Sequence, residues 1–164
     1  MIVIPIKSKI HGLKHFFIDG EDFDLIKDYT WHITKNNYVQ TNIKSNKSEK
    51  RYVHYGIHRL IMNCPDGMVV DHINHNALDN RKENLRICTE SENNRNRRKI
   101  NMEKFSIYKG VYWQNRRKKY RSSIMCNGKF IHIGCFNTEE EAALAYNIKA
   151  SELFGKYALL NIVG

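Results

Sequence analysis

The chain has 164 residues, of which 41% are hydrophobic and 27% are charged, a length and composition that allow one modest core or two small ones. Its formal net charge of +10 predicts an anionic partner, and nucleic acid is the first candidate. The sequence contains neither a basic amphipathic helix nor a lipidation signal, which argues against a membrane partner.

The first part of the chain, residues 1–56, is predicted to be a small α+β module. Asp19-Gly20-Glu21-Asp22 predicts a turn, and the spacing of Phe23, Ile26 and Tyr29 after it predicts a short helix. The N-terminal residues lack the apolar region of a signal peptide and the features of a transit sequence, so we expect a cytoplasmic protein of a bacterial or phage-infected host cell. Stretches rich in aromatic and β-branched residues predict strands at residues 3–6, 15–18, 38–41 and 51–54.

The next segment, residues 57–98, predicts a short helix, two strands and a second helix. The helix covers residues 57–62, and Pro65-Asp66-Gly67 suits a tight turn before a first strand at residues 69–73. A second strand follows at residues 85–88. Thr89-Glu90-Ser91-Glu92 fits a capping box, so the second helix is expected to begin after Thr89. Residues 99–107 are predicted to be a basic linker.

The last segment, residues 108–164, predicts three strands and one helix. Asn127-Gly128 between two alternating runs is a strong hairpin signal. Thr138-Glu139-Glu140-Glu141 forms a capping box for the helix, and Gly155 is placed to end it. The strands are expected at residues 110–113, 120–125 and 130–136. No CxxC pair occurs among the cysteines, so we expect reduced thiols rather than a zinc site or disulfides at Cys64, Cys88, Cys126 and Cys135.

Residues 69–98 contain the most informative pattern of the chain. An Asp71-His72 pair is followed by Asn84 within Glu83-Asn84-Leu85-Arg86 and by Asn93 within Glu92-Asn93-Asn94. Phosphodiester hydrolysis needs an activated water, a cation that neutralises the phosphoryl oxygens and stabilisation of the leaving oxygen, and a site of this size can supply all three. An Asp-His pair alone is common in loops, but the complete string favours a nuclease.

This string resembles the HNH endonuclease family, in the branch found in phages and other mobile elements. The resemblance implies a ββα-metal nuclease module, and with the three strands and one helix expected after it the fold class is α+β, with a three-stranded antiparallel sheet packed on one helix. It implies that His72 is the general base, that Asp71 and Asn93 hold one divalent ion, and that Asn84 has a structural role in bracing the loop between the strands. Oxygen ligands favour Mg²⁺ or Mn²⁺ over zinc.

Other polar residues near the motif receive less specific interpretations. His58 and Arg59 either reach phosphate or carry charge on the surface of a helix. Solvated loop positions are the favoured interpretation for His75, Asn76, Asp79, Asn80 and Arg81.

The C-terminal segment is similar to the Apetala-two / ethylene-response-factor DNA-binding domain. The similarity rests on residues 108–111, 119–124, 133–136, 140–146 and 159–161. It implies a three-stranded sheet in the major groove with a helix behind it. Several positions that carry Arg or Trp in that family hold Tyr112, Gln114, Ser123, Met125 and His132 here, so its target sequence does not transfer.

Alternation along the strands places Ile124, Ile131 and Ile133 against the helix and the residues between them toward DNA. Phe130 belongs to this outward set. The expected DNA-binding residues are Arg95, Arg97, Arg98, Lys109, Arg116, Arg117, Lys118, Lys119, Arg121, Ser123, Met125 and His132.

The interpretation that unites these patterns is a DNA endonuclease of the homing type, which acts on double-stranded DNA as a monomer or weak dimer without a protein partner. One metal site per chain implies a nick in one strand, and double-strand cleavage then requires a dimer or successive nicks. A non-catalytic, sequence-specific DNA-binding regulator and an RNA-binding protein remain the alternatives.

Overall fold

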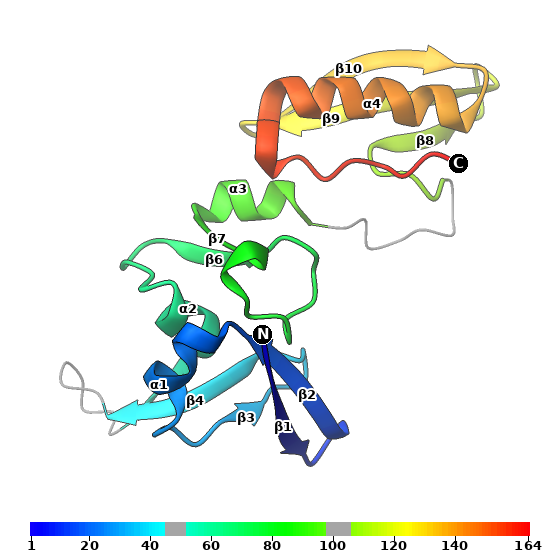
Figure 1. Ribbon diagram of the computed structural model, residues 1–164. Helices are drawn as coiled ribbons and strands as arrows, with labels where there is room; N and C mark the ends of the chain where they lie inside the picture. The colour runs from blue at the N-terminus through cyan, green and yellow to red at the C-terminus, as the bar shows by residue number, and fades with distance from the viewer. Residues whose placement is uncertain (45–51, 98–105) are drawn as a thin grey trace. The chain divides into compact units, whose positions relative to one another are not determined.

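The computed structural model describes residues 1–44, 52–97 and 106–164. The chain divides into two compact units, residues 1–90 and residues 91–164, each of which mixes short helices with small antiparallel sheets (Figure 1).

Unit 1 begins with an antiparallel hairpin of β1 (Ile2–Ser8) and β2 (Gly12–Ile18). A short 3-10 turn, Gly20–Asp22, and α1 (Phe23–Ile26) follow, close to where the sequence predicts a turn and a helix. A three-stranded sheet of order β3-β4-β5 comes next, and its strands are β3 (His32–Ile33), β4 (Val39–Lys44) and β5 (Tyr52–Gly56). β3 was not expected from the sequence, because two residues are too few to show alternation.

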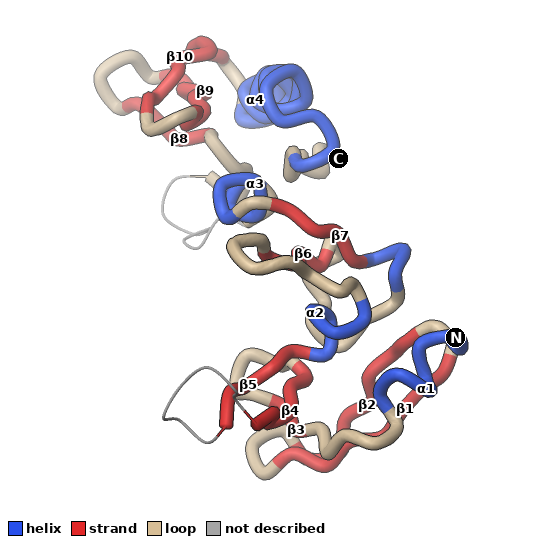
Figure 2. Tube along the Cα trace, turned by 90° about the vertical axis from the view of Figure 1, so that its left-hand side faces the viewer, coloured by secondary structure: helices blue, strands red, loops and turns tan. Residues whose placement is uncertain are grey.

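The second half of unit 1 carries the motif. After α2 (Ile57–Ile61), the strands β6 (Val69–His72) and β7 (Leu85–Cys88) pair antiparallel, with Asp71 opposite Arg86 and His72 opposite Leu85. The connection between them is an irregular loop that ends in a 3-10 turn, Lys82–Asn84 (Figure 2). The helix α3 (Glu90–Arg95) begins directly after Thr89, where the sequence predicts its start.

One hydrophobic core runs through unit 1. It joins residues of the first hairpin, such as Phe16 and Ile18, to Val39 and Ile57 and to Leu85 of β7. This core spans the expected boundary at residue 56, because Phe16, Ile18 and Val39 on one side of it pack in the same cluster as Ile57 and Leu85 on the other. Residues 1–56 and the β6–β7 hairpin are parts of one unit.

Unit 2 contains α3 and the C-terminal segment. Its sheet has the order β10-β9-β8, formed by β8 (Val111–Gln114), β9 (Lys119–Cys126) and β10 (Lys129–Phe136). The helix α4 (Glu139–Phe154) lies along this sheet, and a 3-10 turn, Gly155–Tyr157, follows it (Figure 2). Val111 and Ile124 of the sheet are buried against Ala142, Tyr146 and other apolar residues of α4.

Two local predictions in unit 2 are confirmed by the backbone. Asn127 and Gly128 both have positive φ, 50° and 74°, as the two central residues of a type I′ hairpin turn do. The hydroxyl of Thr138 accepts from the backbone N–H of Glu141, and the Glu141 side chain accepts from the backbone of Thr138, so the capping box is complete. Gly155, with φ 50°, ends the helix.

A β-bulge interrupts the pairing of β9 and β10. His132 lies opposite Ser123, whereas Gly134 lies opposite Ser122, so Ile133 is the extra residue. A bulge bends its strand locally, and Ile131 and Ile133 both pack against the cluster that contains Tyr146 and Ala150 of α4. Strict alternation would also place them together, so the sequence gives no sign of the bulge.

The four cysteines lie in the described ranges and form no disulfide there; Cys64 and Cys88 are buried, and Cys126 and Cys135 are partly exposed. None of the helices in the described ranges is both long and apolar enough to cross a membrane.

Candidate active site

The candidate site begins at the end of β6, where Asp71 and His72 are 6% and 5% exposed. Neighbouring strand residues point to opposite faces, so the two side chains have different surroundings. Oδ2 of Asp71 accepts hydrogen bonds from Nε and Nη2 of Arg86 on β7, at 2.9 and 2.6 Å. The imidazole of His72 lies among other rings instead.

The proton of the His72 ring can be assigned from its partner. Nε2 lies 3.2 Å from Oδ1 of Asn80, and the amide Nδ2 of Asn80 donates to the carbonyl of Ala77. The Asn80 oxygen therefore faces the ring, so Nε2 carries the proton and Nδ1 carries the lone pair. Burial lowers the pKa of His72 below its ordinary value, against the opposing effects of Asn80, Asp71 and Asp79. The ring is neutral at pH 7.

Two rings from outside the β6–β7 hairpin pack against His72. The His58 ring, from α2, has its centroid 5.2 Å from that of His72, and the Tyr38 ring, next to β4, lies 5.8 Å away. Tyr38 and His58 also contact each other at 5.7 Å. Burial, helped by His72 and Arg59, lowers the pKa of His58 to about 3. At pH 7 His58 is therefore uncharged, and its ring packs against that of His72 without electrostatic repulsion.

His58 and Arg59 both make contacts within unit 1, and whether either of them reaches phosphate stays a prediction. His58 packs inward, and Arg59 donates to backbone carbonyls, including that of Met68 at 2.7 Å. Its other amino group reaches the carbonyls of Cys64 and Pro65. The guanidinium thus holds together the turn between α2 and β6. Arg59 and Met68 are nine residues apart, so the sequence alone does not reveal this contact.

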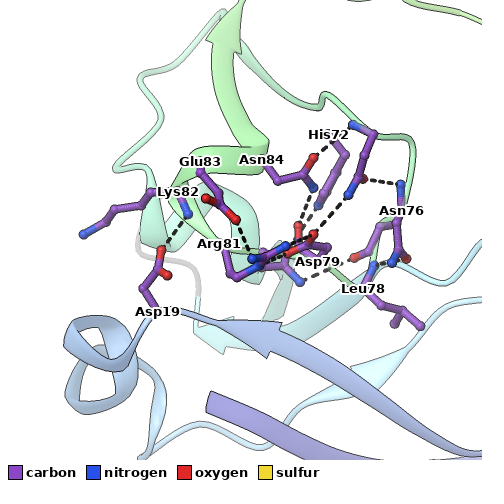
Figure 3. Close-up of polar contacts among 12 residues, drawn as sticks. Asp19, His72, Asn76, Leu78, Asp79, Arg81, Lys82, Glu83 and Asn84 are labelled. Carbon is purple, nitrogen blue, oxygen red and sulfur yellow. Dashed lines mark hydrogen bonds and ion pairs between the residues drawn. The ribbon is translucent and has the colours of Figure 1, made fainter. Parts of the chain in front are cut away.

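Asn84 connects the two ends of the loop between β6 and β7. Its Oδ1 accepts from the backbone N–H of Asn74 at 2.9 Å, and its Nδ2 donates to the carbonyl of Asp79 at 2.7 Å (Figure 3). Its own carbonyl accepts from the N–H of Ile73. Asn84 touches backbone on both sides of the loop and is 5% exposed.

Asp79 and Asn80 are buried, 4% and 0% exposed, and the prediction that they are solvated is wrong. The Asp79 carboxylate accepts from Nε and Nη2 of Arg81, both at 2.8 Å, and from Nδ2 of Asn74 (Figure 3). These bonds with Arg81 lower the pKa of Asp79. The high frequency of Asn and Asp in this loop could have indicated an ordered turn, because their short side chains hydrogen-bond to nearby backbone groups.

The first hairpin of unit 1 and the residue that follows it hydrogen-bond to the loop between β6 and β7. The N–H of Phe17 donates to the carbonyl of Leu78, and the carbonyl of Phe17 accepts from the N–H of Asn80, both at 2.8 Å. Asp19 accepts from the backbone N–H of Lys82 at 2.8 Å (Figure 3). Asn80, the partner of His72, is thus fixed by β2 as well as by its own loop.

The donor atoms at the motif suit a hard cation. Asp71 offers carboxylate oxygen and Asn93, on α3, carboxamide oxygen, the ligand types that Mg²⁺ and Mn²⁺ take in proteins. A cation bound by Asp71 would compete with Arg86 for that carboxylate. Asp71 belongs to unit 1 and Asn93 to unit 2, so their convergence stays a prediction. Within the described ranges, no cluster of three or more His, Cys, Asp or Glu suited to a metal occurs.

The outward face of the unit 2 sheet holds many of the expected DNA-binding residues. Arg121 donates to Nδ1 of His132 at 3.3 Å and lies over the ring of Tyr112. Met125 and Phe130 are 52% and 70% exposed. The turn before β9 and the first residue of that strand expose four consecutive basic side chains, Arg116, Arg117, Lys118 and Lys119.

Three expected DNA contacts are placed differently. Ser123 shares the outward face but is 4% exposed, because the hydroxyl of Tyr112 covers and hydrogen-bonds it. Nζ of Lys109 donates to the carbonyls of Arg95 and Arg97 at the end of α3, and burial lowers its pKa to about 8. The Arg95 guanidinium lies over the Phe154 ring. Lys109 and Arg95 thus attach α3 to the rest of unit 2. Arg97 is exposed, and Arg98 lies outside the described residues.

Comparison with known proteins identifies the family of this site. Residues 55–95 match the family model described as HNH endonuclease. A protein of Acanthamoeba polyphaga mimivirus, named as an uncharacterized HNH endonuclease, is 33% identical over 147 residues, which cover 88% of this chain and 73% of that protein. Protein 3.8 of Escherichia phage T7 is 31% identical over 94 residues, 57% of this chain and 76% of the phage protein.

The matched residues contain the β6–β7 hairpin, its loop and α3, which is a nuclease motif with a buried histidine at its centre. The chain belongs to the HNH endonuclease family.

Proposed function

We propose that this chain is a metal-dependent DNA endonuclease of the homing type that hydrolyses phosphodiester bonds with His72 as general base. Asp71 and Asn93 hold one Mg²⁺ or Mn²⁺ ion, which neutralises charge on the phosphoryl oxygens when bound. Family membership and the viral and phage sources of the relatives support this assignment.

The observation that carries the proposal is the state of the His72 ring. A general base must be unprotonated and held in one orientation near the water that it activates. The ring is neutral because it is buried. Its orientation is fixed by Asn80 at Nε2 and by the His58 and Tyr38 rings, which pack against it in edge-to-face geometry. Nδ1 is therefore the atom that accepts the proton of the attacking water.

The surrounding residues have separate tasks in this proposal. Asn80 orients the imidazole and stabilises the charged ring that forms when Nδ1 takes a proton, because its amide oxygen accepts from Nε2–H. Asn84 holds the loop that carries Asn80. Arg86 balances the carboxylate of Asp71 in the absence of a cation.

Unit 2 is proposed to place the chain on duplex DNA in the manner of an Apetala-two-like domain. The exposed basic turn at residues 116–119 and the face of Arg121 and His132 support this role. Phosphate contacts from such residues position a protein on DNA without specifying sequence. The protein then nicks one strand per bound chain, and it works as a monomer or weak dimer.

The test is Mg²⁺-dependent nicking of supercoiled plasmid by the His72→Ala variant. We expect nicking to fall by about a hundredfold or more, the usual contribution of a general base, while affinity for DNA stays within about twofold. His15→Ala is the matched control, because His15 is exposed on β2 and is remote in sequence from the motif. It should cut like the parent chain.

Undiminished nicking by His72→Ala would remove the base assignment. DNA binding by the parent chain with no nicking under any divalent cation would support the non-catalytic regulator instead. A parent chain that binds structured RNA in preference to duplex DNA would contradict both.

A further inference from the structure

One face of the β3–β4–β5 sheet carries a row of polar side chains. Thr41 and Val39 of β4 point inward and are buried, so Gln40, Asn42 and Lys44 point outward. Paired residues of an antiparallel sheet share a face, which adds the partners of these three positions. The outward row consists of His32, Gln40, Asn42, Lys44, Tyr52 and His54.

Contacts within this row confirm that its members lie together. The side chains of Gln40 and His32 are hydrogen-bonded at 3.0 Å. The His32 and His54 rings meet edge to face with centroids 6.3 Å apart. Lys44, Tyr52 and His54 are exposed, and no residue of the described chain covers them enough to bury them.

The row leads directly to the candidate catalytic histidine. Gly56 is paired with Gln40, and a Cβ built on Gly56 would lie 2.5 Å from the His58 ring, so this ring occupies the outward face where Gly56 has no side chain. Tyr38 lies two residues before Gln40 and is 42% exposed. Both rings contact His72. The outward face of the sheet therefore ends at the two rings that pack against His72.

Charge along unit 1 is divided in a way that favours an anion on this face. Residues 19–28 contain Asp19, Glu21, Asp22, Asp24 and Asp28, whereas residues 29–44 and 52–65 contain no Asp or Glu. The second group includes Lys35 and Lys44. An anionic strand would be repelled from α1 and accepted along β3–β4–β5.

We propose that the outward face of the β3–β4–β5 sheet binds the backbone of duplex DNA next to the phosphate that is cut. The proposal rests on the proposed function. From Tyr38 to Lys44 the chain covers about 20 Å at about 3.3 Å per residue, the length of roughly six base pairs. Lys44 pairs with a phosphate, and His54, Asn42, Gln40 and Tyr52 donate to backbone oxygens. In this proposal unit 1 binds DNA independently of unit 2, in addition to carrying the residues that cut it.

The experiment uses the full chain with the double substitution Lys44→Ala and His54→Ala. Binding to a restriction fragment of the nicked plasmid is measured in Mg²⁺-free buffer over a range of salt, and the nicking rate is measured at saturating DNA. We expect affinity to fall about tenfold and the slope of log affinity against log salt to drop by about one. The nicking rate at saturation should stay within about twofold of the parent.

The matched control is the double substitution Lys7→Ala and His15→Ala, which removes the same two residue types from exposed positions of β1 and β2. Its affinity and salt slope should equal those of the parent. Thermal melting of both variants checks that the fold is kept.

The outcomes separate this proposal from the proposed function. A parent chain that nicks DNA while the Lys44/His54 variant binds with parental affinity and salt slope overturns the docking face and leaves the endonuclease intact. A parent chain that does not nick removes the endonuclease, and the binding measurements still decide whether this face holds DNA. Equal losses in the two double variants would show a nonspecific charge effect and overturn the proposal.

Discussion

The rings of His58 and His72 pack edge to face, and the proposed function requires His72 to stay unprotonated. Burial does this for both, because a charged imidazole loses more hydration than its neighbours replace. Nδ1 of His58 is buried without a hydrogen-bond partner in the described chain, so protonating it has no local compensation. The burial of neutral His58 beside the proposed base therefore makes the stability of the folded chain depend on pH.

That dependence predicts a loss of stability in mild acid. The pKa of His58 is about 3 in the folded chain and about 6.5 when unfolded, so between these values the unfolded state binds the proton more tightly. Stability is complete above pH 6.5 and is lost as pH falls, by up to about 1.4 kcal/mol per pH unit for this residue. His72 acts in the same direction.

Urea unfolding at pH 7 and pH 5 checks this for the parent and for His58→Phe, which keeps a ring against Tyr38 and His72. The parent should lose about 1 to 2 kcal/mol more than the variant over this interval. The His15→Gln control should lose as much as the parent. Parallel losses in the parent and in His58→Phe would contradict the assignment of the effect to position 58.

The structural elements differ in how far local sequence determines them. Asn127-Gly128 and the Thr138/Glu141 capping box are local, and both form as predicted because backbone geometry over four residues suffices. The bulge at Ile133 depends on pairing with β9, and the burial of Asn80 depends on β2, more than sixty residues earlier. The motif gave the positions of His72 and Asn84, whereas the residues that hold them come from contacts that no spacing reveals.

The turn before β8 shows such a contact in unit 2. Gly110 has φ 76°, and an added Cβ would lie 2.1 Å from the Tyr146 ring and 2.7 Å from the carbonyl oxygen of Ser123. Gly128 has nearly the same φ, 74°, with open space around it. Substituting these two glycines therefore distinguishes the effect of backbone strain, which both positions share, from that of a steric clash, which only Gly110 has.

Gly128→Ala should lower the free energy of unfolding of the chain by about 1 to 2 kcal/mol, the cost of a left-handed residue with a side chain. In Gly110→Ala the new methyl group must also push aside the ring of Tyr146, a residue of α4. The free energy of unfolding should therefore fall by about 3 kcal/mol or more. Urea denaturation followed by the circular dichroism of the helices measures both. Equal losses would mean that Tyr146 moves aside without cost, and that the close approach of the turn to α4 has no energetic weight.

The charge of the whole molecule is distributed unevenly between its units. Residues 1–90 contain 13 basic and 11 acidic residues, and residues 91–164 contain 14 and 6. Most of the excess of +10 thus belongs to unit 2, which also carries the exposed turn at residues 116–119. An endonuclease that meets DNA mainly through unit 2 should owe most of its salt dependence to that unit.

With about 6 to 10 phosphate contacts, affinity for duplex DNA should fall on the order of a thousandfold between low and moderate salt. Replacing Arg116, Arg117 and Lys118 by Gln should reduce the slope of log affinity against log salt by about two to three, since each lost phosphate contact contributes about 0.9. Replacing Lys7, Lys9 and Lys14 of the first hairpin by Gln removes the same net charge and should leave the slope close to that of the parent. Binding titrations by fluorescence anisotropy at several salt concentrations distinguish the two. If both triple variants lower the slope equally, net charge rather than the basic turn governs binding, and if the parent shows a flat salt response, DNA is not held through its phosphates.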